Sequence, residues 1–321
     1  MSLKMHPVIA DLILLRKQFI KSRLIFVGGP RMTAILKALG ATNSALEKMK
    51  TVSNGLRGDP TLPFRKSRNG RFCFDFEQSK VRRLEFQPFV LSVEENFVRH
   101  DSGQIRKFEE LDEDLQGNSA LQALLKFKAL MFHGVATKQR PKLNYKTDNF
   151  ICTLFNLRTV TNKDLLGEPA LEGVHSDGVD FTMTTFLGSK NMTDNSAATF
   201  VHDIDAPNAV RWDEVDPKHT LGCYQHRHFL DTLLFVDHER KHSLSPVYAA
   251  DAELPATRDM LIFFTRKPVV EGHVSHPYDS LKPHTIRPME VSLDGECDAV
   301  VDWNQLQGYF GVGPFRKDEV I

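Results

Sequence analysis

A histidine and an aspartate separated by one residue, His175 and Asp177, form the most informative short motif in the sequence. On an extended backbone, residues i and i+2 point to the same face with their Cα atoms about 7 Å apart. The imidazole and the carboxylate can therefore converge on one metal ion. The motif alone is weak evidence, because a chain with 13 histidines and many aspartates contains such pairs by chance. It indicates a metal centre only if a third ligand arrives from another strand.

That third ligand is expected downstream, after the apolar run at 231–237. Two histidines, His238 and His242, follow this run and are candidates for the position. Two imidazoles and one carboxylate on one face form the facial triad that suits Fe(II), and the triad leaves three coordination positions free. Sulfur ligands do not accompany these residues, which favours iron over structural zinc.

The segment 238–242, His-Glu-Arg-Lys-His, also matches the zinc-peptidase pattern HExxH. In that pattern two histidines face one side of a helix and the glutamate, here Glu239, acts as the base. The surroundings oppose a helix, because the segment follows a β-like run directly and Pro246 would end a helix within about one turn. A zinc peptidase that uses His238, Glu239 and His242 stays as an alternative, and a non-catalytic jelly-roll binding protein is a third hypothesis.

Two arginines lie in phase with apolar residues on predicted strands. Arg258 shares a face with every second residue as far as Phe264, and Arg158 is in phase with the apolar residues of 149–158. Burying an uncompensated charge is expensive, and a guanidinium fork is suited to a carboxylate. Each arginine is therefore expected to bind a carboxylate, either on a ligand or in an ion pair within the protein; the alternative for Arg258 is a position at the strand end from which the side chain reaches solvent.

Composition limits the class of protein. The 321 residues are 41% hydrophobic and 26% charged, and 41 basic residues balance 41 acidic ones. Nothing in this balance indicates nucleic-acid binding, and the basic group from Arg65 to Arg71 is interpreted as a solvated loop. Four scattered cysteines without a CxxC pair favour a reducing compartment, and no segment approaches the length of a membrane helix. We expect a cytoplasmic protein that acts on a small molecule; the sequence does not indicate its oligomeric state.

The periodicity of apolar residues divides the chain into two parts. Helical spacing predicts helices over 7–22, 32–39 and 118–133, the last with Asn118 or Ser119 as its N-cap. A strand is predicted at 71–76. Beyond about residue 145, short alternating runs separated by turn-forming residues are typical of an antiparallel sandwich or jelly roll. These runs span 149–158, 181–187, 197–203, 231–237, 258–264 and 285–292.

The predicted fold class is mainly β with flanking helices (α+β). We expect an N-terminal part, 1–140, with helices that pack on a catalytic β core, 141–321. The two parts can share one hydrophobic core, so that the chain forms one continuous domain.

These residues together resemble the 2-oxoglutarate/Fe(II)-dependent dioxygenases. The resemblance rests on His-x-Asp at 175–177, on a distal histidine at 242 in the context His-Ser-Leu-Ser-Pro, and on Arg258 in the next strand. The words Glu-Gly-Val-His-Ser-Asp-Gly at 172–178 and Asp-Thr-Leu at 231–233 are similar to one branch, which includes the bacterial L-isoleucine dioxygenase and related amino-acid hydroxylases.

The resemblance implies a double-stranded β-helix (jelly-roll, cupin-like) core in which His175, Asp177 and His242 bind iron. It also implies that Arg258 binds the distal carboxylate of 2-oxoglutarate. Fe(II), 2-oxoglutarate and O₂ would then be required, and succinate and CO₂ would be released. The implied reaction is hydroxylation of a free or N-substituted aliphatic amino acid.

The sequence departs from the family pattern at one position. Many of these dioxygenases carry Ser or Thr two residues after the arginine, whereas position 260 is Met, so a different hydroxyl must assist Arg258. For the substrate or co-substrate we predict contacts from Arg158, Phe181 and Asn191.

Overall fold

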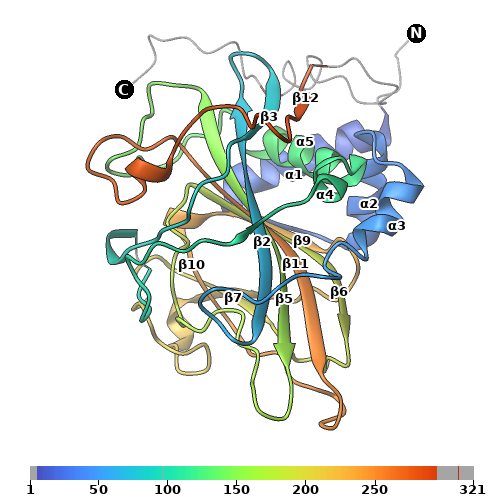
Figure 1. Cartoon of the computed structure of the whole chain (residues 1–321), viewed down its shortest axis with the longest axis vertical. Coiled ribbons are helices and arrows are strands. Elements are labelled where there is room, and N and C mark those ends of the chain that lie inside the picture. Colours follow the sequence, from blue (N-terminus) through green and yellow to red (C-terminus); the bar gives the residue numbers. More distant parts are fainter. Residues whose placement is uncertain (1–5, 96, 295–309, 311–321) are drawn as a thin grey trace.

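The computed structural model describes residues 6–95, 97–294 and 310. It combines a large and a small antiparallel sheet with helices gathered at one side (Figure 1). The α-helices are α1 Pro7–Ser22, α2 Gly29–Ala38, α3 Asn43–Met49, α4 Glu113–Gln116 and α5 Ser119–Phe132. Short 3₁₀ helices are η1 Val93–Glu95, η2 Pro217–His219, η3 Asp237–Glu239 and η4 His276–Tyr278. The strands are β1 Leu24–Val27, β2 Arg65–Asp75, β3 Lys80–Leu84, β4 Glu109–Glu110, β5 Asn149–Thr161, β6 Phe181–Lys190, β7 Thr199–His202, β8 Thr220–Tyr224, β9 Thr232–Val236, β10 Lys241–Leu244, β11 Ala256–Arg266 and β12 Glu290–Ser292.

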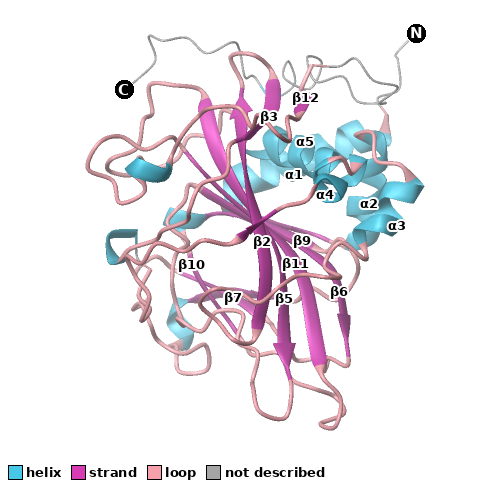
Figure 2. Cartoon of the chain, in the orientation of Figure 1, coloured by secondary structure: helices cyan, strands magenta, loops and turns pink. Residues whose placement is uncertain are grey.

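The large sheet has the strand order β1-β9-β6-β11-β5-β2-β3-β12, and β4 pairs with β2 in parallel. The small sheet has the order β10-β7-β8. Strands from the predicted N-terminal part, β1, β2 and β3, lie in the same sheet as strands from the predicted β core (Figure 2). The sheet therefore continues across the boundary that we predicted near residue 140. The mainly antiparallel β architecture with flanking helices confirms the predicted fold class.

Both faces of the large sheet are buried, and strand β11 shows how. Leu261 and Phe263 belong to the main hydrophobic core, which also contains the apolar faces of α1, α2 and α5. Met260 belongs to a second cluster on the opposite face, and Ile262 and Phe264 pack against it. This division follows from the two-residue period of a strand. The helices thus cover one face of the sheet, and the other face is free to build a site.

Helix α5 is fixed to the sheet by an unusual buried lysine. Asn118 caps the helix by accepting a hydrogen bond from the backbone N–H of Ala120 at 2.8 Å, as predicted. Lys128 is fully buried, and its Nζ donates to the carbonyl oxygens of Phe181 (3.2 Å) and Phe263 (2.6 Å). Burial lowers the pKa of Lys128 to about 7. The contacts join α5 to β6 and β11, two neighbouring strands of the large sheet.

Among the described helices, none combines the length and the apolar character needed to cross a bilayer.

Candidate active site

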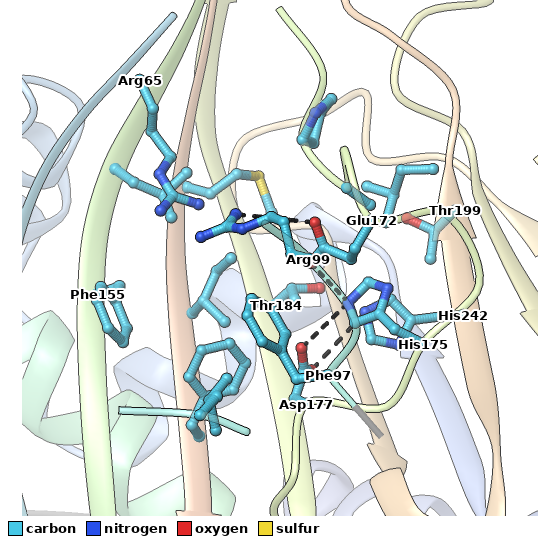
Figure 3. Close-up of a pocket in the computed structure, with 18 of the residues that line it drawn as sticks. Arg65, Phe97, Arg99, Phe155, Glu172, His175, Asp177, Thr184, Thr199 and His242 are labelled. Carbon is cyan, nitrogen blue, oxygen red and sulfur yellow. Dashed lines mark ion pairs between the residues drawn. The ribbon is translucent and has the colours of Figure 1, made fainter. Parts of the chain in front are cut away.

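Three predicted ligands from two parts of the chain meet at one point. His175 and Asp177 lie in the segment between β5 and β6, whereas His242 lies on β10. The backbones of His175 and His242 pair directly, with N–O distances of 3.0 and 2.9 Å. One ligand atom from each of the three buried side chains lies within 4.8 Å of the others, and Figure 3 shows the three groups converging. The structure therefore brings together the triad that the sequence predicts.

Neighbouring groups orient two of these side chains. His175 Nδ1 lies 2.8 Å from the carbonyl oxygen of Gly173. Because a carbonyl only accepts, this contact places the proton on Nδ1 and leaves Nε2 free to bind a metal. Thr182 donates its hydroxyl to Asp177 Oδ2 at 2.8 Å, and Asp237 accepts the backbone N–H of Asp177 at 2.9 Å. The ligand set is therefore supported by hydrogen bonds from a second layer of residues.

The electrostatics of the triad favour a positive charge between its members. Burial opposes protonation of His175, but Glu172 and Asp177 raise its pKa to about 9. Burial also opposes ionisation of Asp177, yet His242 and His175 hold the pKa of this carboxyl below its usual value. Burial lowers the pKa of His242 to about 3. Two imidazole nitrogens and one carboxylate oxygen on one side suit Fe(II), which supplies the positive charge that the site favours.

A cavity of about 100 Å³ opens beside the triad. The cavity is lined by Arg258 and by the residues of β11 on the same face, Met260, Ile262 and Phe264, as the alternation predicted. Aromatic side chains such as Phe155 complete this wall. Arg258 is 3% exposed, and its Nε has no hydrogen-bond partner within the described chain. Burial without a compensating carboxylate lowers the pKa of Arg258 to about 10. The guanidinium is charged at neutral pH, and an anion in the cavity would compensate it.

Two hydroxyl groups line the cavity, those of Thr184 and Thr199. Thr184 lies opposite Ile262 in the register of β6 and β11, four positions along β11 from Arg258. Its hydroxyl is 3.1 Å from Nε2 of His226, whose pKa is lowered to about 3 by burial and by Arg258. Thr159 lies directly opposite Arg258 in the register of β5 and β11, and its buried Oγ1 has no hydrogen-bond partner among the described residues. It therefore joins Thr184 and Thr199 as a candidate for the hydroxyl that replaces the one missing at Met260.

Four further charged side chains reach the cavity or its wall, and we did not predict them from the sequence. They are Arg65, Arg99, Arg106 and Glu172. Arg65 lies on β2, so our interpretation of 65–71 as a solvated loop was wrong: Ser67 and Arg71 are buried in this strand. Glu172 was noticed only as part of the motif around His175. Arg99 and Arg106 lie in an irregular segment between β3 and β4, where no periodicity marks the buried face.

Three residues predicted to contact the substrate lie elsewhere. Arg158 forms two hydrogen bonds with Asp259, both at 2.6 Å, and this ion pair is the alternative that the sequence left open. Phe181 packs in the main core on the helix side of the sheet. Asn191 donates to carbonyl oxygens of the loop at 251–254. None of these three residues lines the cavity, so no ligand contact is assigned to them.

The geometry of 238–242 excludes the zinc-peptidase pattern. A single 3₁₀ turn, η3, ends at Glu239, and the chain then enters strand β10. Glu239 pairs with Arg23 at 2.6 Å, and His238 contacts the carbonyl oxygen of Lys138 instead of the triad. HExxH chemistry needs both histidines on one helical face, and that arrangement is absent here.

Comparison with known proteins identifies the family. A family model described as 2OG-Fe dioxygenase matches residues 50–264. The chain belongs to this family, whose members require Fe(II), 2-oxoglutarate and O₂. It is an oxidoreductase by this membership, as predicted.

Two known proteins are similar to this chain over most of its length. The chain is 46% identical over 290 residues to the bifunctional enzyme flvA of Aspergillus flavus, a match that covers 90% of this chain and 35% of flvA. The chain thus spans about a third of the length of that relative. A solved structure of TqaL, a Fe(II)/(alpha)ketoglutarate-dependent dioxygenase, is 52% identical with a TM-score of 0.77, and the match covers 89% of this chain and 96% of TqaL.

A more distant structure supports the fold alone. A bsmA homolog from Methylobium petroleophilum has a TM-score of 0.66 at 19% identity, and the match covers 81% of this chain and 95% of that one. The narrower resemblance to the L-isoleucine dioxygenase branch stays a prediction.

Proposed function

We propose that this chain is a Fe(II)- and 2-oxoglutarate-dependent dioxygenase with His175, Asp177 and His242 as the iron ligands. Arg258 binds the distal carboxylate of 2-oxoglutarate. The observation that carries the proposal is the convergence of the three ligand atoms within 4.8 Å beside a cavity that contains a buried, uncompensated guanidinium. Membership of the 2OG-Fe dioxygenase family supports it.

The protein's own residues hold and orient the reactants. Gly173 fixes the His175 ring through its carbonyl oxygen, and Thr182 fixes one oxygen of Asp177. Arg258 holds the co-substrate by the end away from the metal, and aromatic side chains form much of the cavity wall. When bound, the ferrous ion with 2-oxoglutarate and O₂ supplies the oxidising chemistry, in which succinate and CO₂ are released and a C–H bond of the substrate is oxidised.

The proposed substrate is a small molecule, a free or N-substituted aliphatic amino acid that becomes hydroxylated. A cavity of about 100 Å³ whose wall combines apolar and charged side chains supports a compact substrate with an apolar side chain and ionic ends. The resemblance to amino-acid hydroxylases points in the same direction. We also expect the protein to work in the cytoplasm, in keeping with the free thiols of Cys73, Cys152 and Cys223.

Anaerobic spectroscopy tests the proposal directly. Addition of Fe(II) and then 2-oxoglutarate to the protein should produce a visible metal-to-ligand charge-transfer band, and O₂ should then yield succinate. Asp177→Ala should abolish the band, whereas Glu239→Gln should leave it unchanged because Glu239 pairs with Arg23 away from the cavity. Failure of the wild-type protein to form the band would refute the dioxygenase assignment, and a jelly-roll binding protein would be the remaining hypothesis.

A further inference from the structure

Asp237 joins the two segments that carry the predicted iron ligands. Its carboxylate accepts hydrogen bonds from two backbone N–H groups, that of Asp177 at Oδ1 (2.9 Å) and that of Val179 at Oδ2 (3.2 Å). The backbone N–H of Asp237 donates to the carbonyl oxygen of Asp180 at 3.0 Å. Asp237 is fully buried, and it lies outside the wall of the cavity. Its three contacts therefore connect it to the 177–180 turn and not to a ligand.

The 177–179 turn has the shape of an anion-binding site. Gly178 lies between the two donors with φ +73°, a left-handed conformation that favours glycine. Backbone N–H groups in such a turn point to the same side and form a concavity that binds an anion. The anion in this turn is the carboxylate of Asp237, which comes from the end of β9. A residue 60 positions away thus fixes the direction in which Asp177 leaves the chain.

Backbone contacts at two ends hold the ligand-bearing segments in one register. At one end His175 and His242 exchange hydrogen bonds of 3.0 and 2.9 Å, and at the other end the bond from Asp237 to Asp180 closes the pairing. The contacts are five residues apart in both segments, at 175 and 180 in one and at 237 and 242 in the other. Between these ends, the Asp237 side chain holds the turn that contains Asp177.

The position of this carboxylate is costly for the folded protein. Asp237 has no exposed surface, and the charge of Asp177 is close enough to repel it. Backbone N–H groups bind both of its oxygens, so that the repulsion is not cancelled by a cation in direct contact. A buried charge in such surroundings is weak evidence for a stabilising role. A cation bound at the triad would offset the repulsion, which connects the position of Asp237 with the metal centre.

We propose that Asp237 is a positioning residue of the metal centre, which holds the 177–179 turn beside β10 and thereby increases the affinity for Fe(II). It acts through the backbone of Asp177, whereas Thr182 orients the Asp177 side chain. The inference rests on the proposed function, because it takes His175, Asp177 and His242 as the iron ligands.

Asp237→Asn and Asp231→Asn form a matched pair of variants. Asp231 directly precedes β9, whereas Asp237 directly follows it. Asp231 is also buried, and its two oxygens accept hydrogen bonds from the backbone N–H groups of Gly29, Arg227 and His228 at 2.7, 2.7 and 2.8 Å. Each substitution keeps the shape of the side chain but places an NH₂ group where an oxygen accepted a backbone N–H. Both variants should therefore unfold at a lower urea concentration than the wild type.

Fe(II) affinity separates a positioning role from a structural one. Anaerobic isothermal titration without co-substrate measures it, at a temperature and pH at which urea unfolding shows that each protein is folded. Asp237→Asn should raise the Kd for Fe(II) about tenfold or more, as expected when a group that orients a metal ligand is lost. Asp231→Asn should keep the Kd within about twofold of the wild-type value, although it is also destabilised.

Hydrogen exchange in the metal-free wild type provides a second measurement, which does not require the Asp237→Asn variant to fold. The backbone N–H groups of Asp177 and Val179 should exchange at least about a hundredfold more slowly than in an unstructured peptide, because Asp237 binds them before any metal does. Exchange of both groups at the rate of an unstructured peptide would overturn the inference.

Two results of the titration would also overturn it. One is an unchanged Fe(II) affinity in Asp237→Asn, and the other is an equal loss in Asp237→Asn and Asp231→Asn, which a general loss of stability explains. His242→Ala tests the proposed function separately. If the wild type binds no Fe(II), or if His242→Ala binds it as tightly as the wild type, the iron ligands are wrong and the proposed function fails, whatever the exchange rates at Asp177 and Val179.

Discussion

Replacement of Arg258 by methionine is expected to stabilise the ligand-free protein and to weaken its binding of 2-oxoglutarate. Burial alone lowers the pKa of Arg258 from its ordinary value to about 10. This difference corresponds to a cost of about 3 kcal/mol for the charged form in the folded protein. Both the folded and the unfolded chain carry the charge at pH 7, so the full cost is present there, and it is relieved only as the pH rises through about 10.

Methionine removes this cost and fills a similar volume. We therefore expect the free energy of unfolding to rise by about 1–3 kcal/mol, measured by urea denaturation at pH 7 without metal or co-substrate. The same change removes a charge-assisted pair of hydrogen bonds to 2-oxoglutarate, worth about 3 kcal/mol, so the Kd from the charge-transfer titration should rise about a hundredfold. Stability and binding should thus change in opposite directions.

Arg158→Met is the matched control, because Arg158 differs from Arg258 in having a partner. Its removal leaves Asp259, 6% exposed, without the two hydrogen bonds of 2.6 Å. The free energy of unfolding should fall by about 1–3 kcal/mol. If Arg258→Met destabilises the protein as Arg158→Met does, Arg258 has a structural partner, and the reasoning from its unpaired burial is refuted.

Three further predictions test other parts of the structure. Thr182→Val removes the hydrogen bond to Asp177 Oδ2 at nearly constant shape, and isothermal titration should show Fe(II) affinity reduced about tenfold or more; unchanged affinity would contradict the orienting role. The pKa of Lys128, lowered to about 7, means that the unfolded chain binds a proton that the folded protein lacks between about pH 7 and 10.5. The free energy of unfolding of the wild type should therefore rise by up to about 1.4 kcal/mol per pH unit in that range, relative to that of Lys128→Met. Urea unfolding of both proteins at pH 7.5 and 9 measures this difference. Equal changes with pH in the two proteins would contradict the lowered pKa. Glu239→Gln should lower the melting temperature by a few degrees, because it weakens the ion pair with Arg23, and it should leave succinate formation unchanged. A loss of turnover with unchanged iron binding would instead indicate that Glu239 has a catalytic role.

The strands of the site could be predicted because the alternation of side chains between the two faces of a strand is a local property of the sequence. The runs predicted at 149–158, 181–187 and 258–264 match β5, β6 and β11, apart from their ends. Alternation also placed Arg258 correctly on the face that lines the cavity. It could not say which face of β6 meets the helices, because residues on both faces of this strand are buried. Phe181 was therefore assigned to the substrate although it packs against the helices.

The charged wall of the cavity could not be predicted for a different reason. Arg99 and Arg106 lie in the segment between β3 and β4, which contains one 3₁₀ turn, η1. In an irregular segment the backbone direction changes at each residue, so sequence spacing does not show which side chains share a surface. Charged residues there are ordinarily expected in solvent. Only the folded backbone shows that aromatic rings from the same segment bury Arg106.

The arginines of this protein show that the partner of a buried charge, and not its position in a motif, separates structural from ligand-binding residues. Arg158 and Arg258 have the same pattern in the sequence, an arginine in phase with apolar residues on a central strand. Asp259 forms an ion pair with Arg158, whereas Nε of Arg258 has no hydrogen-bond partner within the described chain. Arg99 and Arg106 repeat the contrast around Asp101, which binds one fork closely and leaves the other at 3.8 Å. A folded protein retains an unpaired buried guanidinium at a cost in stability. In the function that we propose, the distal carboxylate of 2-oxoglutarate compensates Arg258, and the cost is recovered when the co-substrate binds.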